Sequence, residues 1–505
     1  MISRYIKMIL NAKVYDLVQE TPVHPMHFLS KNLGNRILVK REDLQSVFSF
    51  KIRGAYNRML HLSASERSRG VIAASAGNHA QGVALAASRL GIHAQIVMPV
   101  TTPLIKVQSV RERGGNVVLH GDNFDQACAH ALALAKRENF VFIHPYDDPA
   151  VIAGQGTIGL ELTRQISEPI EAVFIPVGGG GLAAGIAVYL KYVRPEIKII
   201  GVESDSSACL QAALKAGRRV TLPRVGIFAD GVAVATIGKE PFRVLQSLID
   251  DVVVVSNDEI CAAIKDLFED TRSIAEPAGA LGLAGLKKYA QHHGLKGKTL
   301  LTIESGANVN FGRLRYVSQR AEFGEGREIL LAATISSSPG SLMAFCQLLH
   351  KHNVTELNYR YSSAEAAQIL VGLEIRSSGG DRLGIISALQ RHGYAVHDLT
   401  DNELAKEHVC SMIGGQATGV DNEHLYRFIF PEKSGALMRF LAAMPKRWNI
   451  SLFNYRNQGS AYASVCVGLQ IPRGEQKHLK KFLAKVNYPS VAENDNPAYK
   501  LFLRG

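Results

Sequence analysis

Long apolar runs are absent from this 505-residue sequence, and no stretch reaches the roughly 20 apolar residues that a membrane-spanning helix needs. Membrane insertion is therefore not expected. Cysteine is scarce: the six cysteines stand far apart and form no CxxC pair, so neither a zinc site nor a disulfide framework is indicated. Such unpaired thiols are typical of a reducing cytoplasm. The 17 histidines include no HExxH spacing, and we expect no metal site.

Acidic residues are in the minority, which leaves a net charge of +12. The basic residues are spread along the chain and interleaved with acids, as in Arg111-Glu112-Arg113. This pattern predicts a solvated basic surface that attracts small anions, rather than a nucleic-acid-binding face. Residues 1–15 contain no acid, as in transit peptides, but this segment is short and contains almost no serine. We therefore expect a first helix there.

From about residue 35 to 320, short apolar runs alternate with longer helical patterns. Val71–Ala74 and Ala94–Met98 are typical of buried strands, and Asn78–Leu90 is typical of the helix between them. Because parallel strands need such crossover helices, the sheets should be largely parallel. Residues 1–320 are thus predicted to form an α/β region of two units, the smaller inserted at about 42–145, with a cleft between them.

The character of the sequence changes after Arg320. Residues 321–328 are polar and contain glycine, and we expect a linker there. An internal repeat with a period of 95 or 96 residues follows, carried by three pairs of matching blocks: 339–345 with 434–440, 358–360 with 454–456, and 371–375 with 467–471. Three matches in order indicate a duplicated module, with copies at 329–420 and 421–505. Each copy is predicted to run strand, helix, strand, strand, which is an α+β sandwich of the split βαβ kind.

Lys51 has an unusual environment for a charged residue, because Phe48, Phe50 and Ile52 surround it just before a helical pattern. Desolvation lowers the pKa of a lysine and makes its neutral amine a nucleophile that can form a Schiff base. The alternative is a lysine whose aliphatic stem carries the charge from a helix N-terminus to solvent. The segment by itself does not separate the two interpretations.

The sequence Ser75-Ala76-Gly77-Asn78 connects a predicted strand to a predicted helix. Backbone N–H groups at such a helix N-terminus can bind a carboxylate, and the amide of Asn78 can reach a polar ring substituent. Ser75 or Asn78 can equally serve as the helix cap. Capping and ligand binding are compatible.

Four consecutive glycines, Gly178, Gly179, Gly180 and Gly181, precede Leu182 at another strand-to-helix connection. Their backbone can surround an anion such as phosphate, and the helix dipole adds attraction. The spacing from Gly178 to Ala183 also fits a dinucleotide fingerprint, with Glu203 after the next strand, so a nicotinamide dehydrogenase is a competing interpretation. That interpretation leaves Lys51 and the Ser75 loop unexplained.

Ser305 follows the apolar run 300–303, where parallel sheets bind their ligands. This position predicts a cofactor contact, although an ordinary turn serine is the commoner case. Glu276 begins the sequence Glu276-Pro277-Ala278, where a carboxylate can act as a structural helix cap.

Together these motifs resemble the fold-type II pyridoxal-phosphate enzymes, and most closely the biosynthetic threonine dehydratases, also called threonine ammonia-lyases. The resemblance covers the whole chain, including the duplicated tail. Four motifs carry it: SFKIRGA at 49–55, SAGNHAQG at 75–82, GGGGL at 178–182 and SGAN at 305–308.

The resemblance implies a role for each motif. Lys51 would bind pyridoxal 5'-phosphate as a Schiff base and later move the Cα proton of the substrate. Asn78 would contact the ring hydroxyl, and Ser305 the pyridine nitrogen. The phosphate would be bound by Gly178, Gly179, Gly180, Gly181 and Leu182, and the substrate carboxylate by Ser75, Ala76, Gly77 and Asn78. A serine at the ring nitrogen leaves the pyridine unprotonated, which suits β-elimination rather than transamination.

The implied reaction converts L-threonine to 2-oxobutyrate and ammonia as the first step of isoleucine biosynthesis, with L-serine as an alternative substrate. A serine dehydratase, a threonine synthase and a sensor with an inactive enzyme domain are the other interpretations, and the intact Lys51 argues against the last. Two positions depart from the family pattern. Glu304 is a carboxylate beside Ser305, which strand alternation should turn away from the ring. Cys209 stands where some relatives have the second acid of a cation site with Glu203, so no metal is assigned.

The duplicated tail resembles paired ACT-like regulatory domains. The resemblance implies that isoleucine inhibits the enzyme, that valine relieves this inhibition, and that the chain forms a homotetramer. Tyr359 and Tyr455, which match across the repeat, are the candidates for lining effector pockets, although both could be core tyrosines. The loops before the first helix differ, Ser338-Pro339-Gly340 against Lys433-Ser434-Gly435, so the two copies need not bind alike.

Overall fold

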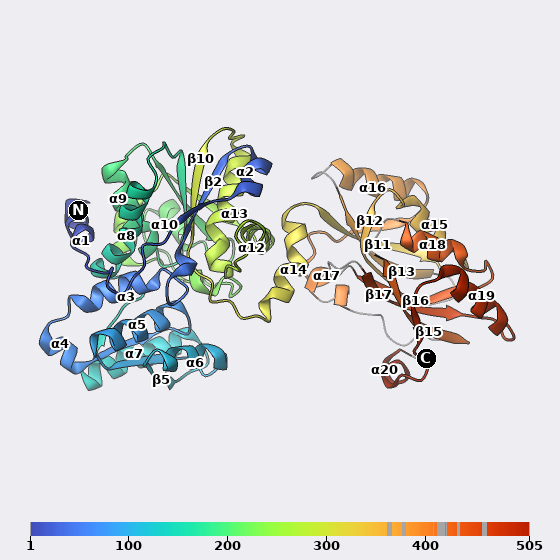
Figure 1. Ribbon diagram of the computed structural model, residues 1–505, viewed down its shortest axis with the longest axis horizontal. Helices are drawn as coiled ribbons and strands as arrows, with labels where there is room; N and C mark the ends of the chain where they lie inside the picture. Colours follow the sequence, from blue (N-terminus) through green and yellow to red (C-terminus); the bar gives the residue numbers. More distant parts are fainter. Residues whose placement is uncertain are drawn as a thin grey trace. The chain divides into compact units, whose positions relative to one another are not determined.

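The computed structural model of the protein describes residues 2–360, 366–375, 380–407, 409–411, 420, 422–431, 435–456 and 462–503. The chain divides into two compact units, Met1–Gly324 and Glu325–Gly505 (Figure 1). We call them the catalytic unit and the regulatory unit, after the roles that the resemblance implies for them. No helix in the described part of the chain is long and apolar enough to cross a membrane.

The larger sheet of the catalytic unit has six strands in the order β1-β2-β10-β7-β8-β9, all parallel except for β1 at the edge. The strands are β1 (Val23–Pro25), β2 (Arg36–Arg41), β7 (Ala172–Pro176), β8 (Lys198–Ser204), β9 (Asp251–Val255) and β10 (Thr299–Glu304). Both faces are covered, because alternate residues of β7 belong to different cores: Val173 and Ile175 to one, Ala172 and Phe174 to the other.

The helices of this sheet fall into two layers. Against the Val173 face lie α1 (Ile2–Leu10), α8 (Pro149–Gln165), α9 (Gly181–Val193), α10 (Cys209–Ala216) and α11 (Lys239–Leu248). Against the Phe174 face lie α2 (His27–Leu33), α12 (Asn257–Thr271), α13 (Pro277–His292) and α14 (Arg313–Gly324). The helix expected at the N-terminus is thus α1, which buries Tyr5, Ile6 and Ile9.

The smaller sheet has four parallel strands in the order β5-β4-β3-β6. They are β3 (Val71–Ala74), β4 (Ala94–Met98), β5 (Asn116–Leu119) and β6 (Val141–Phe142). The accompanying helices are α3 (Lys51–Leu60), α4 (Ala64–Arg69), α5 (Asn78–Leu90), α6 (Leu104–Glu112) and α7 (Phe124–Glu138), whereas η1 (Glu42–Leu44) contacts β10 of the larger sheet. Cores lie on both faces of this sheet as well. The expected parallel-sheet α/β architecture is confirmed.

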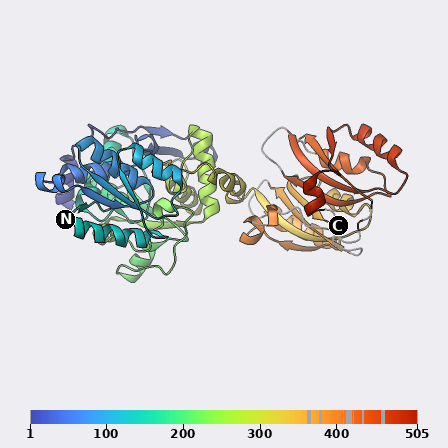
Figure 2. The same cartoon turned by 90° about the horizontal axis from the view of Figure 1, so that it is seen from below.

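The regulatory unit contains one antiparallel sheet of eight strands in the order β14-β11-β13-β12-β16-β17-β15-β18. The first copy supplies β11 (Glu328–Ser336), α15 (Ser341–Leu348), β12 (Asn353–Arg360), β13 (Ala366–Glu374), α16 (Gly380–Arg391) and β14 (Ala395–Asp398). The second supplies β15 (Glu423–Pro431), α18 (Ala436–Ala443), β16 (Asn449–Arg456), β17 (Tyr462–Gln470), α19 (Gln476–Val486) and β18 (Ser490–Ala492). Figure 2 shows the two copies next to each other.

Two features of this unit differ from the sequence-based expectation. Each copy has a second helix and a fourth strand, and the copies share one sheet through the pairing of β12 with β16. The helices α15, α16, α18 and α19 pack into a single core on one face.

The segment 321–328, predicted as a linker, is helical up to Gly324, because α14 packs on α12 through Arg320–Asp258 and Lys265–Glu322 ion pairs. Lys433 and Ser434 lie outside the described residues.

Candidate active site

The sequence motifs lie at the carboxyl ends of parallel strands, two in the large sheet and one in the small sheet. The Ser75 loop follows β3, the glycine loop follows β7, and Ser305 follows β10. The Lys51 motif is held against the last of these: Ser49 forms a β-bridge with Gly306, and Phe50 N–H donates to the Ser305 carbonyl at 3.2 Å. Segments from both α/β units therefore meet at one place.

Lys51 is the first residue of α3, and its side chain is half-buried. Its Nζ donates to the Pro145 carbonyl at 3.0 Å and lies 5.1 Å from the ring centroid of Phe50. Desolvation lowers the pKa of Lys51 to about 8, and the carboxylate of Glu276 opposes part of this change. A fraction of the amine is therefore uncharged near neutral pH, as a Schiff-base nucleophile requires. The alternative, in which the aliphatic stem carries the charge of Lys51 out to solvent, does not describe this side chain.

The glycine loop is packed so tightly that side chains are excluded from it. A Cβ atom on Gly179 would overlap the ring of Tyr146, and one on Gly178 would lie 2.8 Å from Cα of Val232. Gly180 adopts a left-handed backbone (φ 89°) and caps α9. Gly181 and Leu182 form the first turn of α9, whose N–H groups have no acceptor within the helix. This backbone cradle fits a phosphate group.

Asn78 is the first residue of α5, and its amide is bound on both sides. Its Nδ2 donates to Glu276 Oε1 at 2.6 Å, and its Oδ1 accepts from Asn308 Nδ2 at 2.6 Å. Ser75 Oγ accepts the N–H of Gly77 at 3.2 Å. No heavy atom of the described residues lies within 4 Å of a Cβ built on Gly77, so the loop borders open space where a substrate carboxylate can approach.

Ser305 is 3% exposed, and its hydroxyl donates to the Ala278 carbonyl at 3.3 Å. The neighbouring Glu304 is directed to the adjacent strand, where Arg41 Nε lies 3.0 Å from Glu304 Oε2. Burial and Asp43 raise the pKa of Glu304, Arg41 lowers it, and together they bring it to about 8. Glu304 therefore belongs to a buried group with Arg41 and Asp43.

Glu203 caps a helix. Its two carboxylate oxygens accept the N–H groups of Leu210 and Gln211 at 2.7 and 2.8 Å. Because both oxygens already accept hydrogen bonds at the start of α10, Glu203 is not available to bind a ribose hydroxyl, as a dinucleotide site would require. In the described part of the chain, no three His, Cys, Asp or Glu side chains are grouped so that they could hold a metal ion.

Several neighbours of the site lack a predicted contact or differ from the prediction. The sequence predicts Glu276 as a helix cap, yet its side chain makes no capping hydrogen bond and bonds to Asn78 instead. Asn308 lies in the SGAN motif, which predicts no contact for its side chain. Tyr146 and Pro145 join Lys51 to the glycine loop and carry no sequence signal of their own.

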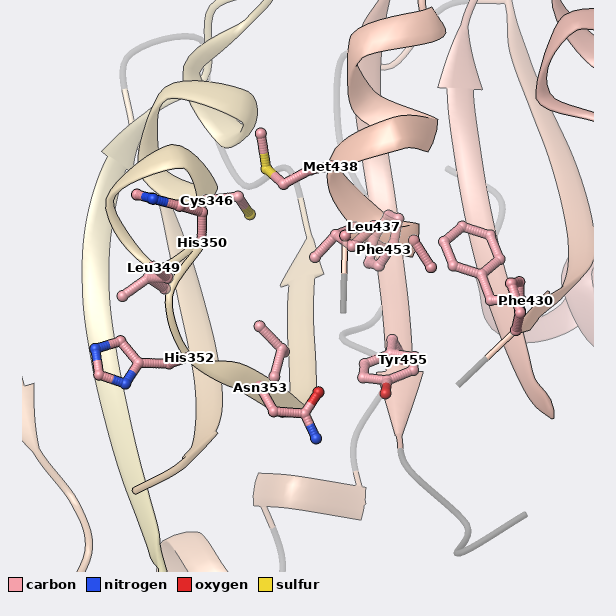
Figure 3. Close-up of a pocket in the computed structure, with 14 residues that line it drawn as sticks. Cys346, Leu349, His350, His352, Asn353, Phe430, Leu437, Met438, Phe453 and Tyr455 are labelled. Atoms are coloured by element: carbon pink, nitrogen blue, oxygen red, sulfur yellow. The ribbon is translucent and has the colours of Figure 1, made fainter. Parts of the chain in front are cut away.

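The regulatory unit has a pocket between the end of α15 and the start of α18. Figure 3 shows Asn353 and Tyr455 near each other at one end and Met438 at the other. Its lining also includes apolar residues, among them Leu349, Val354, Phe430, Leu437 and Phe453, and the two histidines His350 and His352. Tyr455 therefore faces a cavity. Tyr359 is 3% exposed and lies in the core, so we retain Tyr455 as the effector candidate.

Residues 14–306 match the family model described as pyridoxal-phosphate dependent enzyme, and the chain belongs to this family. The chemistry of the site agrees, since an enclosed lysine and a phosphate cradle are what this cofactor needs. Residues 319–409 and 414–503 each match the C-terminal regulatory domain of threonine dehydratase. Within its family the chain thus belongs to the enzymes that carry two copies of this regulatory domain.

Curated relatives match over nearly the full length. The chain is 52% identical over 502 residues to an L-threonine dehydratase, biosynthetic, from Burkholderia multivorans, covering 99% of both chains. It is 51% identical over 503 residues to the corresponding Escherichia coli protein, covering 100% of this chain and 98% of that one.

Solved structures match the catalytic unit. The processed form of threonine deaminase isoform 2 from Solanum lycopersicum is 51% identical, with a TM-score of 0.62, over 63% of this chain and 93% of that chain. Maize serine racemase is 33% identical, with a TM-score of 0.59, over 62% of this chain and 96% of that chain.

Proposed function

We propose that this protein is a threonine dehydratase that converts L-threonine to 2-oxobutyrate and ammonia, the first step of isoleucine biosynthesis. The observation that carries the proposal is the match to L-threonine dehydratases over 99% of the chain, including both regulatory copies. The geometry supports it, because Lys51 follows Phe50, which bonds to Ser305, and donates to Pro145, whose neighbour Tyr146 packs on the glycine loop.

Each motif has a defined task in this reaction. The amine of Lys51 holds the cofactor and then accepts the Cα proton of threonine, for which its lowered pKa of about 8 leaves a reactive uncharged fraction. The loop Ser75–Asn78 binds the substrate carboxylate through backbone N–H groups. Gly178–Leu182 bind the cofactor phosphate, and Ser305 faces the ring nitrogen without a formal charge. Pyridoxal phosphate supplies the conjugated ring that withdraws electrons from Cα.

Atoms balance without a further reactant. The Cα proton and the β-hydroxyl leave threonine as water, the released enamine takes up one water, and ammonia departs.

The test is to purify the protein with pyridoxal phosphate and to measure 2-oxobutyrate from L-threonine and pyruvate from L-serine. We expect the higher kcat/KM with threonine. If L-threonine yields no 2-oxobutyrate and L-serine is converted to D-serine, the enzyme resembles its serine racemase neighbour in function and the proposal is wrong.

Feedback control is proposed to act through the pocket at Tyr455. Leu349, Leu437 and Met438 provide an apolar wall for a branched side chain, and Asn353 and Tyr455 provide polar groups for an amino acid backbone. Isoleucine fits this combination, and valine would compete for the same place. Inhibition requires that isoleucine bind better to the low-activity arrangement than to the active one.

The repeat supplies a matched control for this pocket. Met438→Trp fills the cavity and should abolish isoleucine binding and inhibition, whereas Met343→Trp changes the equivalent residue of the first copy, outside the pocket. Isothermal titration with isoleucine and inhibition curves for both variants check this. If isoleucine inhibits Met438→Trp as strongly as it inhibits the wild type, this pocket is not the effector site.

The assembly is proposed to be a homotetramer that acts in the cytoplasm. All six cysteines are free thiols, which agrees with a reducing compartment. Light scattering after size-exclusion chromatography should give four times the chain mass of 54.9 kDa. A mass of one or two chains would contradict the tetramer.

A further inference from the structure

Glu276 is a buried carboxylate beside the active site for which the proposed reaction has no use. It directly precedes α13 and is 4% exposed. Burying an ionisable group is costly unless it is bound by partners, so its position calls for an explanation. Its backbone N–H donates to the Gly306 carbonyl at 3.1 Å, which holds it next to the Ser305 segment.

A chain of amide hydrogen bonds determines which way Asn78 faces. The Val47 carbonyl can only accept a hydrogen bond, so it orients the amide of Asn308, whose Nδ2 donates to it at 2.8 Å. The same Nδ2 donates to Asn78 Oδ1 at 2.6 Å. The Asn78 amide nitrogen is thereby turned toward Glu276, whose Oε1 accepts from it at 2.6 Å. One N–H of Asn78 is left for a ligand.

Two glycines keep this arrangement accessible. A Cβ atom on Gly306 would lie 2.9 Å from Glu276 Oε1, and one on Gly231 would lie 3.4 Å from the same oxygen and 4.0 Å from Asn78 Nδ2. Side chains at these positions would enter the space around the carboxylate. The two glycines therefore leave room for the hydrogen bond between Asn78 and Glu276.

We propose that Glu276 is a positioning residue, which holds the amide of Asn78 so that its remaining N–H donates to the ring hydroxyl of bound pyridoxal phosphate. The inference rests on the cofactor role proposed for Asn78. Glu276 and Asn308 act as the two ends of one clamp, the first accepting from the amide and the second donating to it.

The clamp should respond to pH near neutrality. Burial and Asp230 on η2 (Asp230–Val232) raise the pKa of Glu276, Asn78 and Lys106 lower it, and together they bring it to about 7. Lys51 on α3 is the other nearby cation, and the backbone of Asn308 also faces the carboxylate. Above pH 7 the carboxylate is a strong acceptor for Asn78. Below pH 7 the neutral acid is a weaker acceptor, so the affinity for the cofactor should fall.

The test measures the dissociation constant of pyridoxal phosphate from the full-length apoprotein between pH 6 and 9, by fluorescence, together with the absorption maximum of the complex. Glu276→Leu removes the acceptor and should weaken binding about 10- to 100-fold at pH 8. Glu276→Gln keeps an acceptor oxygen without titrating, so it should bind within a few-fold of wild type and lose the pH step near 7. Circular dichroism verifies folding.

Asn308→Ala provides a second route if Glu276→Leu does not fold. It should weaken binding by a similar factor, because it removes the donor that orients the amide of Asn78. Binding by Glu276→Leu within twofold of wild type, or an unchanged pH step in Glu276→Gln, would overturn the inference while leaving the proposed function intact. A wild-type protein that binds no pyridoxal phosphate would instead overturn the proposed function.

Discussion

Two residues beyond Lys51, Arg53 is completely buried between two carboxylates. Its guanidinium donates two hydrogen bonds to Glu42 at 2.7 Å each and two to Glu161 at 2.5 and 2.9 Å. Lys40 completes a charge-neutral group with Glu161 at 2.6 Å. Removing one partner from such a buried group costs about 3–5 kcal/mol. The group anchors the first turn of α3, and with it the position of Lys51.

At this residue scale the first prediction concerns Lys51 itself. Lys51→Ala should lose the visible absorption band of bound pyridoxal phosphate and essentially all dehydratase activity, because no other amine replaces the Schiff-base partner. The fold should persist, since removing the half-buried amine costs one hydrogen bond, to the Pro145 carbonyl, and the contact with the Phe50 ring. Absorption spectra, 2-oxobutyrate assays and thermal unfolding check these points. Turnover close to the wild-type rate would refute the assignment of Lys51.

At the scale of elements, the connection from β7 to α9 combines a backbone requirement with a packing requirement. Gly180 needs a left-handed backbone, and Gly179 faces the ring of Tyr146, whose neighbour Pro145 accepts the hydrogen bond of Lys51. A side chain here would displace both the phosphate cradle and the segment that orients the lysine amine.

Gly179→Val should therefore weaken pyridoxal-phosphate binding by at least about 100-fold, because the new side chain overlaps Tyr146 and blocks the approach of a phosphate to the backbone. Gly384→Val in α16 is the control, since a Cβ atom there meets nothing within 4 Å. Equilibrium dialysis measures the cofactor retained by each variant. Unchanged retention in Gly179→Val, or NAD binding by the wild type, would contradict the phosphate role of this loop.

The pairing of β12 with β16 gives the two matched tyrosines of the regulatory copies different neighbours. Leu357 of β12 pairs with Tyr455 of β16, and Tyr359 pairs with Phe453. The side chains of these four residues thus point to the same face of the sheet, which the helices cover. Although the two tyrosines match across the repeat, Tyr359 is enclosed in the core and Tyr455 borders the pocket.

At the scale of the whole molecule, α14 completes the catalytic unit. Its ion pairs with α12 lie at Arg320 and Glu322, and a Cβ atom on Gly324 would overlap the carbonyl of Asp258. A truncation that preserves this packing should end at Gly324.

We predict that a chain of residues 1–324 retains dehydratase activity within about tenfold and loses isoleucine inhibition. The reason is that the candidate effector pocket lies entirely within the other unit. Steady-state assays with and without isoleucine measure the effect, and full-length Met438→Trp serves as the comparison. If isoleucine inhibits the truncated enzyme as strongly as the full chain, the effector site lies in the catalytic unit.

Local sequence alone predicted much of the site that we propose for this protein. The enclosed lysine, the four glycines and the strand-to-helix loops each depend on a few consecutive residues, because backbone freedom, capping and desolvation by adjacent aromatics are local properties. The alternation of strands and helices likewise determined the parallel-sheet class, since buried parallel strands need apolar runs joined by crossover helices. The repeat revealed the duplication because matched blocks recur at a constant spacing.

Only the tertiary structure decided which distant residues cooperate. Asn78 meets Glu276 across 198 residues and Asn308 across 230 residues, and no periodicity records such a contact. The edge pairing of β12 with β16 depends on two strands meeting in space, as does the difference between Tyr359 and Tyr455. These contacts depend on the path of the chain. A buried polar group must be hydrogen-bonded, and tertiary packing decides which groups lie close enough to be its partners.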